Sequence, residues 1–277
     1  MYGPGTDSKL PYSKSITALD LMREFTPDVI MMWTHYQSRF VIPKYFNRPS
    51  IPSVILEVDY RRVKDKGWYA RHGFKLMLVR GIWESTVIPS VYFPFSVNEE
   101  DIEESKLYKT KVNKITFVGQ TWTDSNRGVK TYASRRQAGE NLAKAGLFKY
   151  QGKVGRKPYV RAITRYDGAL ACAASYRHSP VAKCFEIMGY GTALLCNQID
   201  LADRLFDNYY YKYKDDASDV VQVAHDLLNN HDKRNHYIKK AKEIILERHT
   251  HTKRIDDMIQ IFNAFKTGQP LPRKWGR

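Results

Sequence analysis

Residues 178–195 read HSPVAKCFEIMGYGTALL, a helix-compatible segment followed by a short apolar run. Ser179 and Pro180 are residue types that stand at helix starts, so we expect a helix over 181–188. The run 192–195 is apolar, short and bounded by glycine and asparagine, which is typical of a buried strand. A helix that leads into a buried strand is the unit that doubly wound nucleotide-binding folds repeat.

Lys183 and Glu186 lie on this expected helix. In a nucleotide-binding fold, a glutamate can accept hydrogen bonds from two ribose hydroxyls, and a lysine can balance a diphosphate. The alternative is a surface helix on which both side chains are solvated. The pair alone leaves both interpretations open, so the rest of the chain has to decide between them.

Further strand candidates recur along the chain, separated by segments of helical length. The expected strands cover 28–33, 53–59, 75–80, 91–95, 115–118, 148–150, 168–174 and 209–213. The expected helices cover 15–25, 132–145, 219–229 (capped by Ser218), 233–248 and 254–265, while the basic stretch 152–166 reads as a loop. Pro94 places the strand 91–95 at a sheet edge or a strand end. The alternation predicts an α/β fold with two Rossmann-like domains facing a cleft.

The charged stretch 99–114 reads as a linker between these domains. We therefore expect one domain over 1–114 and a second over 115–250. A C-terminal helix and tail, 251–277, could cross back to the first domain. Gly3-Pro4-Gly5 has no strand before it, so we expect the first domain to be abbreviated.

The charge of the chain is strongly positive. Its 45 Lys and Arg residues exceed its 29 Asp and Glu residues, which gives a net charge of +16. Eleven basic residues and two acidic ones lie within 116–165. Such a field attracts nucleic acid, an anionic membrane surface or a nucleotide diphosphate. A diphosphate occupies only a few cations, so the surplus favours a larger anion.

Other features bear on the compartment. No stretch reaches the ~20 apolar residues of a membrane-spanning helix, and the N-terminal segment lacks the apolar core of a secretory signal. Cys172, Cys184 and Cys196 are odd in number and form no C-x-x-C pair. We therefore expect a cytoplasmic protein (in the host cytoplasm if it is viral) with no zinc site.

Five segments, in order, resemble glycosyltransferases of group 1 related to the spore maturation protein B group. They are PFSVNEEDI (94–102), ITFVGQ (115–120), ASRRQAGENL (133–142), SPVAKCFEIMGYGTALL (179–195) and ERHTHTKRIDDMI (247–259). The resemblance extends roughly from Gly3 to Ile261. It implies the GT-B architecture, with an acceptor-side domain over 1–114 and a nucleotide-sugar-binding domain over 115–250.

The resemblance also implies a donor site. Glu186 matches the second glutamate of the family's Glu–seven residues–Glu motif and would hold the donor ribose, whereas His178 stands where the first glutamate is expected. Lys183 matches a basic residue near the donor diphosphate and is also a catalytic candidate. The implied donor-binding residues are Gly119, Arg135 or Arg136, His178, Lys183 and Glu186.

Asp59 ends the expected strand 53–59, where open α/β sheets place functional groups. The resemblance makes it a candidate base or substrate-positioning residue. The alternative is a helix cap or an ion pair with Arg61 or Arg62. His35 and Arg80 also end strands and are weaker candidates. The terminal signature His249, Thr250 and Arg254 reads as structural.

The implied enzyme is a hexosyl- or pentosyltransferase that uses a nucleotide sugar, most simply a UDP-sugar. The sequence has no D-x-D motif, and Lys and Arg can stabilise a leaving diphosphate, so we expect no metal cofactor. Hydroxylated bases of DNA are the leading acceptor because cations and aromatic side chains are interleaved over 116–165. The expected DNA-binding residues are Arg127, Lys130, Lys153, Arg156, Lys157, Arg161 and Arg165.

Two alternatives stay open. The acceptor could instead be an envelope glycan, a lipid or a protein, and an anionic membrane surface could attract the same charge. A function of another class is a non-enzymatic nucleic-acid-binding protein that reuses the fold. His178 and the short N-terminal segment favour that alternative, whereas Gly119, Lys183 and Glu186 speak against it.

Overall fold

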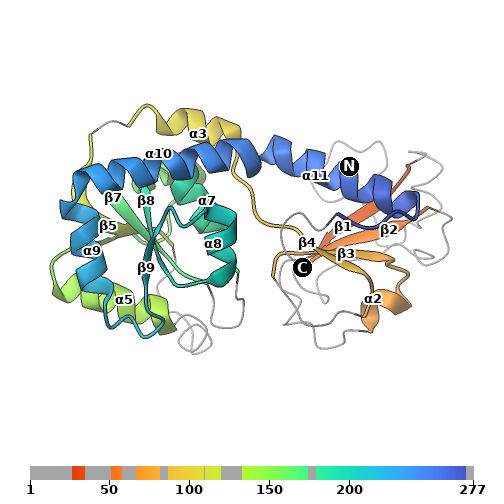
Figure 1. The fold of residues 1–277 in the computed structure, drawn as a ribbon, viewed down its shortest axis with the longest axis horizontal. Helices are drawn as coiled ribbons and strands as arrows, with labels where there is room; N and C mark the ends of the chain where they lie inside the picture. Colours follow the sequence, from red (N-terminus) through yellow and green to blue (C-terminus); the bar gives the residue numbers. More distant parts are fainter. Residues whose placement is uncertain are drawn as a thin grey trace. The chain divides into compact units, whose positions relative to one another are not determined.

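The computed structural model describes residues 27–34, 51–57, 67–81, 87–108, 110–119, 133–173 and 179–272 (Figure 1). The chain divides into two compact units. The first comprises Met1–Phe93 and Ile259–Arg277, and the second comprises Pro94–Met258. The units thus divide after Phe93 and Met258, whereas the sequence suggested divisions after residues 114 and 250.

The first unit contains a four-stranded parallel sheet. Its strands, β1 (Ile30–Thr34), β2 (Ser53–Glu57), β3 (Leu76–Val79) and β4 (Ser90–Tyr92), lie in the order β1-β2-β3-β4. A short helix, α2 (Trp68–Arg71), lies between β2 and β3 in the chain. Every residue of β3 is buried, as expected for a central strand of a parallel sheet. β4 lies at the sheet edge, which agrees with the position expected from Pro94.

The second unit contains a five-stranded parallel sheet. Its strands are β5 (Val112–Phe117), β6 (Phe148–Tyr150), β7 (Tyr166–Ala171), β8 (Ala193–Asn197) and β9 (Tyr211–Tyr213). Their order is β6-β5-β7-β8-β9. The chain moves from β5 outward to β6 and then returns to the other side of β5 to form β7. The β5/β7 boundary is therefore a topological switch point, where ligands bind in doubly wound folds.

Helices cover both faces of this second sheet (Figure 1). Leu195 of β8 packs in a core with residues of α5 (Ala133–Lys144) and α9 (Val220–Asn229), whereas its neighbour Cys196 contacts Cys184 of α7 (Ala182–Gly189). Because successive strand residues point to opposite faces, α5 and α9 lie on one face and α7 on the other. The remaining helices are α3 (Glu99–Ser105), α6 (Arg156–Thr164), α8 (Asp200–Phe206), α10 (His231–Arg248) and α11 (His251–Lys266). In the described parts of the chain, no helix is both long and apolar enough to cross a membrane.

Two expectations about local structure are wrong. The presumed linker contains α3, whose N-terminus is capped by Asn98: the side-chain oxygen accepts from the Glu100 N–H at 3.1 Å. Three acidic residues in its first turn suit the helix dipole, and Ile102 is buried, so the charge run is the exposed side of a packed helix. The presumed basic loop contains α6, where Pro158 occupies the first turn and needs no backbone N–H.

The expected Ser218 cap is also wrong. α9 begins after Asp219, which makes no side-chain cap. Its carboxylate instead accepts a hydrogen bond from the backbone N–H of Lys214 at 2.9 Å. The Asp219 side chain therefore fixes the turn after β9.

The terminal His-Thr…Arg signature is buried in the second unit. Arg254 Nη2 lies 2.8 Å from His249 Nδ1, so this nitrogen accepts and the ring proton is on Nε2, which faces the Leu205 carbonyl at 3.3 Å. Arg254 also pairs with Asp257 at 2.5 Å. The backbone of His249 and His251 bonds to Val97 on both sides. These contacts tie the segment before α3 to the start of α11, which is a structural role.

Candidate active site

The C-terminal end of β5 turns at Gly119, which has a φ of 148°. The Gly119 N–H donates to the Gly152 carbonyl at 2.8 Å, and its own carbonyl accepts from the Tyr150 hydroxyl at 2.8 Å. A Cβ at this position would lie 3.2 Å from the Phe117 ring. The turn therefore requires glycine, and its N–H serves the fold instead of a ligand.

The Phe117 ring, two residues before Gly119 at the end of β5, lies beside two cations. The guanidinium carbon of Arg135 on α5 lies 4.9 Å from the ring centroid, and Lys183 Nζ on α7 lies 5.5 Å from it. This geometry places both cations at the carboxyl end of β5. It also separates the two arginines: Arg135 lies beside Lys183, whereas none of the described contacts joins Arg136 to that group.

Lys183 and Glu186 meet through a residue that the sequence did not single out for this site. The Lys183 ammonium donates to the Tyr159 hydroxyl at 2.9 Å, and this hydroxyl donates to Glu186 Oε2 at 2.5 Å. Lys183 Nζ also lies 4.9 Å from the centroid of the Tyr159 ring. Tyr159 comes from α6, so helices on either side of β7 in the chain build the site together.

Burial controls the protonation of these groups. Burial lowers the pKa of Lys183, and the Arg135 charge lowers it further, while Glu186 opposes the change. Burial and the neighbouring Glu186 carboxylate raise the pKa of Tyr159 well above its ordinary value. Tyr159 therefore keeps its proton and acts as the donor to Glu186. The site holds two cations close together and would be stabilised by an anionic ligand.

A layer of hydrogen bonds supports this edge of the sheet. The Tyr190 ring meets the Tyr159 ring edge-on at 6.4 Å, and the Tyr190 hydroxyl donates to Asp101 of α3 at 3.1 Å. Asn197, at the end of β8, accepts from the Ala173 N–H at 3.0 Å and donates to Asp215 at 2.7 Å. These contacts lock the carboxyl ends of β7, β8 and β9 to one another.

The described members of the expected DNA-binding set are spread along α6 and the residues beside it and do not form one group. Arg156 and Lys157 lie in the first turn of α6, near the Gly119 edge, and Lys153 is exposed just before it. Arg165 caps the other end of α6, where its carbonyl accepts from the Val112 N–H at the start of β5. Arg161 stands 6.0 Å from the Tyr108 ring, beside the acidic helix α3.

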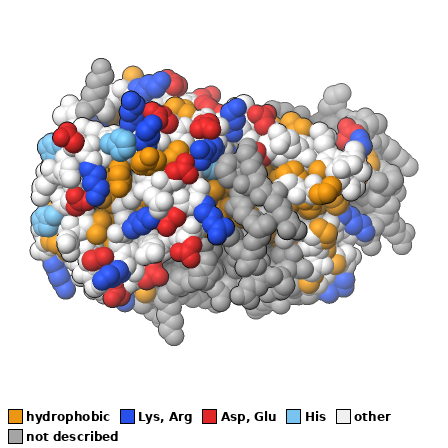
Figure 2. Space-filling view, viewed as in Figure 1, with side chains coloured by type: hydrophobic (Ala, Val, Ile, Leu, Met, Phe, Trp, Pro, Cys, Tyr) orange, Lys and Arg blue, Asp and Glu red, His pale blue; other side chains and the backbone are white. Residues whose placement is uncertain are grey.

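The exposed charges are mixed on the face of the molecule that Figure 2 shows. There, Lys and Arg side chains alternate with Asp and Glu side chains over the described surface. On the described part of this face, the basic side chains therefore do not form one continuous patch.

Several predicted site residues lie outside the described residues: Asp59, His178, Arg127, Lys130 and His35. Arg80 belongs to the first unit, where its guanidinium donates to the Phe93 carbonyl at 3.1 Å and lies over the Phe93 ring. The three cysteines are buried and free, with 3.9 Å between the sulfur atoms of Cys184 and Cys196.

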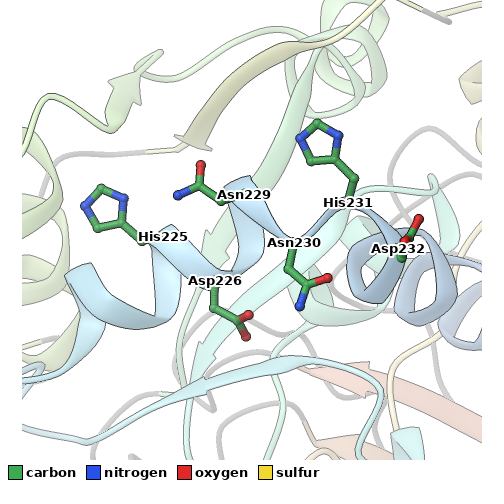
Figure 3. A pocket seen from close by; sticks show the side chains of 6 residues that line it. All are labelled: His225, Asp226, Asn229, Asn230, His231 and Asp232. Carbon is green, nitrogen blue, oxygen red and sulfur yellow. The ribbon is translucent and has the colours of Figure 1, made fainter.

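A separate shallow hollow of about 600 Å³ lies at the junction of α9 and α10. Its lining residues are His225, Asp226, Asn229, Asn230, His231 and Asp232 (Figure 3). Their side chains point to different sides of the junction and do not converge on one point. Among the described residues, no group of three or more His, Cys, Asp or Glu could hold a metal ion. The hollow therefore offers less organised chemistry than the β5/β7 edge.

Tyr159 and Phe117 are the site residues that sequence reasoning missed. Tyr159, Val160 and Ile163 recur at helical spacing, and that periodicity could have revealed α6 despite its glycines and proline. The sequence contained no signal for the contact between Tyr159 and α7, because 24 positions separate Tyr159 from Lys183.

Comparison with known proteins gives a family and a fold. The model of a family described as glycosyl transferase-like matches residues 103–260. No curated protein matches the chain. A glycosyltransferase from Rickettsia africae is 10% identical with a TM-score of 0.54, and the match covers 91% of this chain and 80% of that one.

Two further solved structures share the fold. An alpha-glucosyltransferase in complex with UDP-glucose and DNA is 11% identical with a TM-score of 0.56, covering 88% of this chain and 82% of that one. The sucrose-phosphate synthase of Thermosynechococcus elongatus is 10% identical with a TM-score of 0.55, covering 91% and 77%. At such low identity, these likenesses show the fold alone: an α/β protein of the GT-B class with two Rossmann-like sheets.

Proposed function

The chain belongs to the glycosyl transferase-like family, and on that premise we propose that its second unit binds a nucleotide-sugar donor at the carboxyl ends of β5 and β7. This region, the β5/β7 edge, holds Arg135, Lys183 and Glu186. In the reaction, an acceptor oxygen forms a bond to the anomeric carbon of the sugar while the bond from that carbon to the diphosphate breaks. The acceptor loses a proton, and a nucleoside diphosphate leaves. The enzyme must therefore stabilise negative charge on the leaving group.

The observation that carries this proposal is the group formed by Lys183, Tyr159 and Glu186 beside Arg135. In the proposed site, Lys183 and Arg135 face the diphosphate, and Glu186 accepts from the ribose hydroxyls. A carboxylate suits paired hydroxyls, and two partly desolvated cations suit a diphosphate. The complexes of alpha-glucosyltransferase with UDP and UDP-glucose favour a UDP-sugar as the donor.

A thermal-shift measurement tests donor binding. Wild-type protein is heated with millimolar UDP, GDP and their common sugar conjugates, because a ligand that binds only the folded state raises Tm. At least one of them should raise Tm, and the Glu186→Gln variant should lose that rise. No rise with any of these nucleotides would contradict the proposal.

We further propose that transfer needs no metal ion. Lys183 and Arg135 supply two positive charges where the diphosphate would leave, which is the electrostatic task that a divalent cation performs elsewhere. Activity should therefore survive excess EDTA. Loss on chelation and recovery with Mg²⁺ or Mn²⁺ would contradict this part of the proposal.

We propose that the acceptor is a hydroxylated nucleobase of DNA. We propose Asp59 as the general base that removes the proton of the acceptor hydroxyl. The support is the net charge of +16 and the position of Arg156 and Lys157 at the start of α6, near the donor edge. A base within a duplex would have to leave the stack to reach a sugar donor. If Arg156 and Lys157 contact phosphates, replacing both with Ala should flatten the salt dependence of DNA binding by about two in log–log slope.

Sugar transfer decides the acceptor, because any strongly basic protein adheres to DNA at low salt. Duplexes with hydroxymethylated pyrimidines are compared with unmodified DNA and with glycan and lipid acceptors. Incorporation only into hydroxymethylated DNA is the expected result, and Asp59→Asn should then lower kcat. Transfer to a glycan or lipid, with none to DNA, would replace the DNA acceptor while leaving the donor site in place.

A further inference from the structure

Lys183 and Glu186 are separated by three positions on α7, a spacing at which a lysine and a glutamate commonly pair directly. Instead, the hydroxyl of Tyr159 lies between them, 2.9 Å from the ammonium and 2.5 Å from the carboxylate. The described contacts include no direct ion pair between the two charges. A residue from another helix thus interrupts a pairing that the helix itself would permit.

We propose that Tyr159 is a positioning residue: its hydroxyl holds the Lys183 ammonium and the Glu186 carboxylate apart, so that each stays able to bind the donor. The ligand in this statement rests on the proposed function. The separation of the two charges is a property of the protein alone.

A count of hydrogen-bonding groups supports the proposal. An ammonium has three donors, and Tyr159 accepts one of them; a carboxylate has two oxygens, and Tyr159 donates to one. A direct pair would neutralise both charges and would use hydrogen-bonding groups of the ammonium and the carboxylate on each other. The neutral hydroxyl satisfies one group of each partner and leaves both charges in place.

The Tyr159 hydroxyl is held firmly enough to act as a spacer. Its ring packs edge-on against the Tyr190 ring, a contact that does not depend on the Tyr190 hydroxyl. Burial together with Glu186 raises the pKa of Tyr159, so the proton stays on the phenol at every pH at which the enzyme would work. An ionised phenol could not donate to Glu186.

The groups around Lys183 define what its titration reports. They are the Phe117 ring from β5, Arg135 from α5, Tyr159 from α6, and Cys184 and Glu186 from α7. Among the described groups, only Glu186 is an anion that could draw the ammonium toward it. Without the Tyr159 hydroxyl, we expect Lys183 to pair directly with Glu186, which should raise the pKa of Lys183.

The test compares Tyr159→Phe with Tyr190→Phe. Each removes a single buried hydroxyl from neighbouring rings, but only the first touches Lys183 and Glu186. NMR of lysine labelled with ¹³C at Cε, assigned with Lys183→Arg, follows the Lys183 titration without any ligand. The pKa of Lys183 should rise in Tyr159→Phe and stay unchanged in Tyr190→Phe, and with Glu186→Gln present the rise should vanish.

Donor kinetics supply the second readout. Tyr159→Phe should raise the donor KM about tenfold and change kcat by less than threefold, whereas Tyr190→Phe should leave KM unchanged. A Lys183 pKa that stays or falls in Tyr159→Phe overturns the spacer, as does a lower donor KM, which would make Tyr159 a competitor of the donor. If the wild type binds no nucleotide but the pKa rises, the proposed function fails and the spacer stands.

Discussion

The second sheet carries partly or fully buried cations at both of its edges, and the two edges provide different partners for them. At the start of the strands, Lys111 Nζ donates to the Gly191 carbonyl at 2.8 Å. Arg234 donates to the carbonyls of Leu227 and Leu228 at 3.1 and 2.8 Å and faces Asp167 at 3.5 Å. The protein itself supplies acceptors for these cations.

At the carboxyl ends of the strands, the described contacts of the Lys183 ammonium are with neutral groups. Lys183 donates to a phenol and shares the Phe117 ring with Arg135. Glu186 is reached only through Tyr159 in the described contacts. Both edges thus hold cations, but one edge supplies backbone carbonyls and Asp167 as their acceptors, whereas at the other edge Lys183 donates to a neutral hydroxyl and keeps its charge for an anion.

The largest effect is expected from Arg234→Met, which tests whether the first of these edges is structural. The change leaves two buried carbonyls and Asp167 without their cation, so the free energy of unfolding should fall by about 3 kcal/mol. Urea unfolding measures this loss. The donor KM should stay within twofold of wild type. A much higher KM in a folded variant would contradict a purely structural role for Arg234.

Glu186→Ala is expected to weaken donor binding and leave stability nearly unchanged, which is the reverse of the result expected for Arg234→Met. Loss of charge-assisted hydrogen bonds to a ribose should lower kcat/KM for the donor about a hundredfold, or about 3 kcal/mol, with most of the change in KM. Stability should change little because, among the described hydrogen bonds, the Glu186 side chain makes only the one to Tyr159. Steady-state kinetics with varied donor measure the effect, and unchanged donor kinetics would remove Glu186 from the site.

Gly119→Ala should affect both properties moderately. The φ of 148° and a Cβ 3.2 Å from Phe117 predict a stability loss of about 2 kcal/mol and a displaced ring beneath the two cations. Gly146→Ala is the matched control, because Gly146 also has a positive φ but nothing within 4 Å of the added Cβ. Only Gly119→Ala should raise the donor KM; equal effects of both variants would show backbone strain alone.

The smallest effect concerns pH. Burial, Arg234 and Lys242 lower the pKa of Lys111 to about 8, although Asp167 opposes the change. Between about pH 8 and the ordinary lysine pKa, the unfolded state therefore binds more protons than the folded state, and stability rises with pH. The unfolding free energy of wild type, measured relative to that of Lys111→Met, should increase by about 1 kcal/mol from pH 7 to 9.5. A pH-independent difference would mean that Lys111 stays fully charged.

The sequence predicted the strands of both sheets well because parallel strands are buried on both faces and appear as short apolar runs. The run expected over 192–195 is an example, because it forms most of β8 (Ala193–Asn197), in which every residue is buried. It failed for α3 and α6, where charges, glycines and a proline concealed helices. A run of charged residues is ambiguous, because the exposed face of a helix and a linker between domains can have the same composition.

The candidate site could be predicted only in part. Lys183 and Glu186 were found from their place on a helix before a buried strand. Tyr159 could not be assigned to them, since only the packing of α6 beside α7 brings its hydroxyl between the two charges. The choice of Arg135 over Arg136 likewise depends on helix orientation, which places one guanidinium over Phe117. Contacts of this kind arise from tertiary packing and leave no local pattern.

Isothermal titration with UDP compares the two edges directly, because a lysine can be replaced by methionine at each of them. Wild type and Lys111→Met should bind UDP alike, while Lys183→Met should bind it at least tenfold more weakly, a loss of about 1.4 kcal/mol or more. Circular dichroism verifies that both variants are folded. Equal affinity in Lys183→Met and wild type, or a loss confined to Lys111→Met, would contradict the assignment of the donor to the carboxyl edge of the sheet.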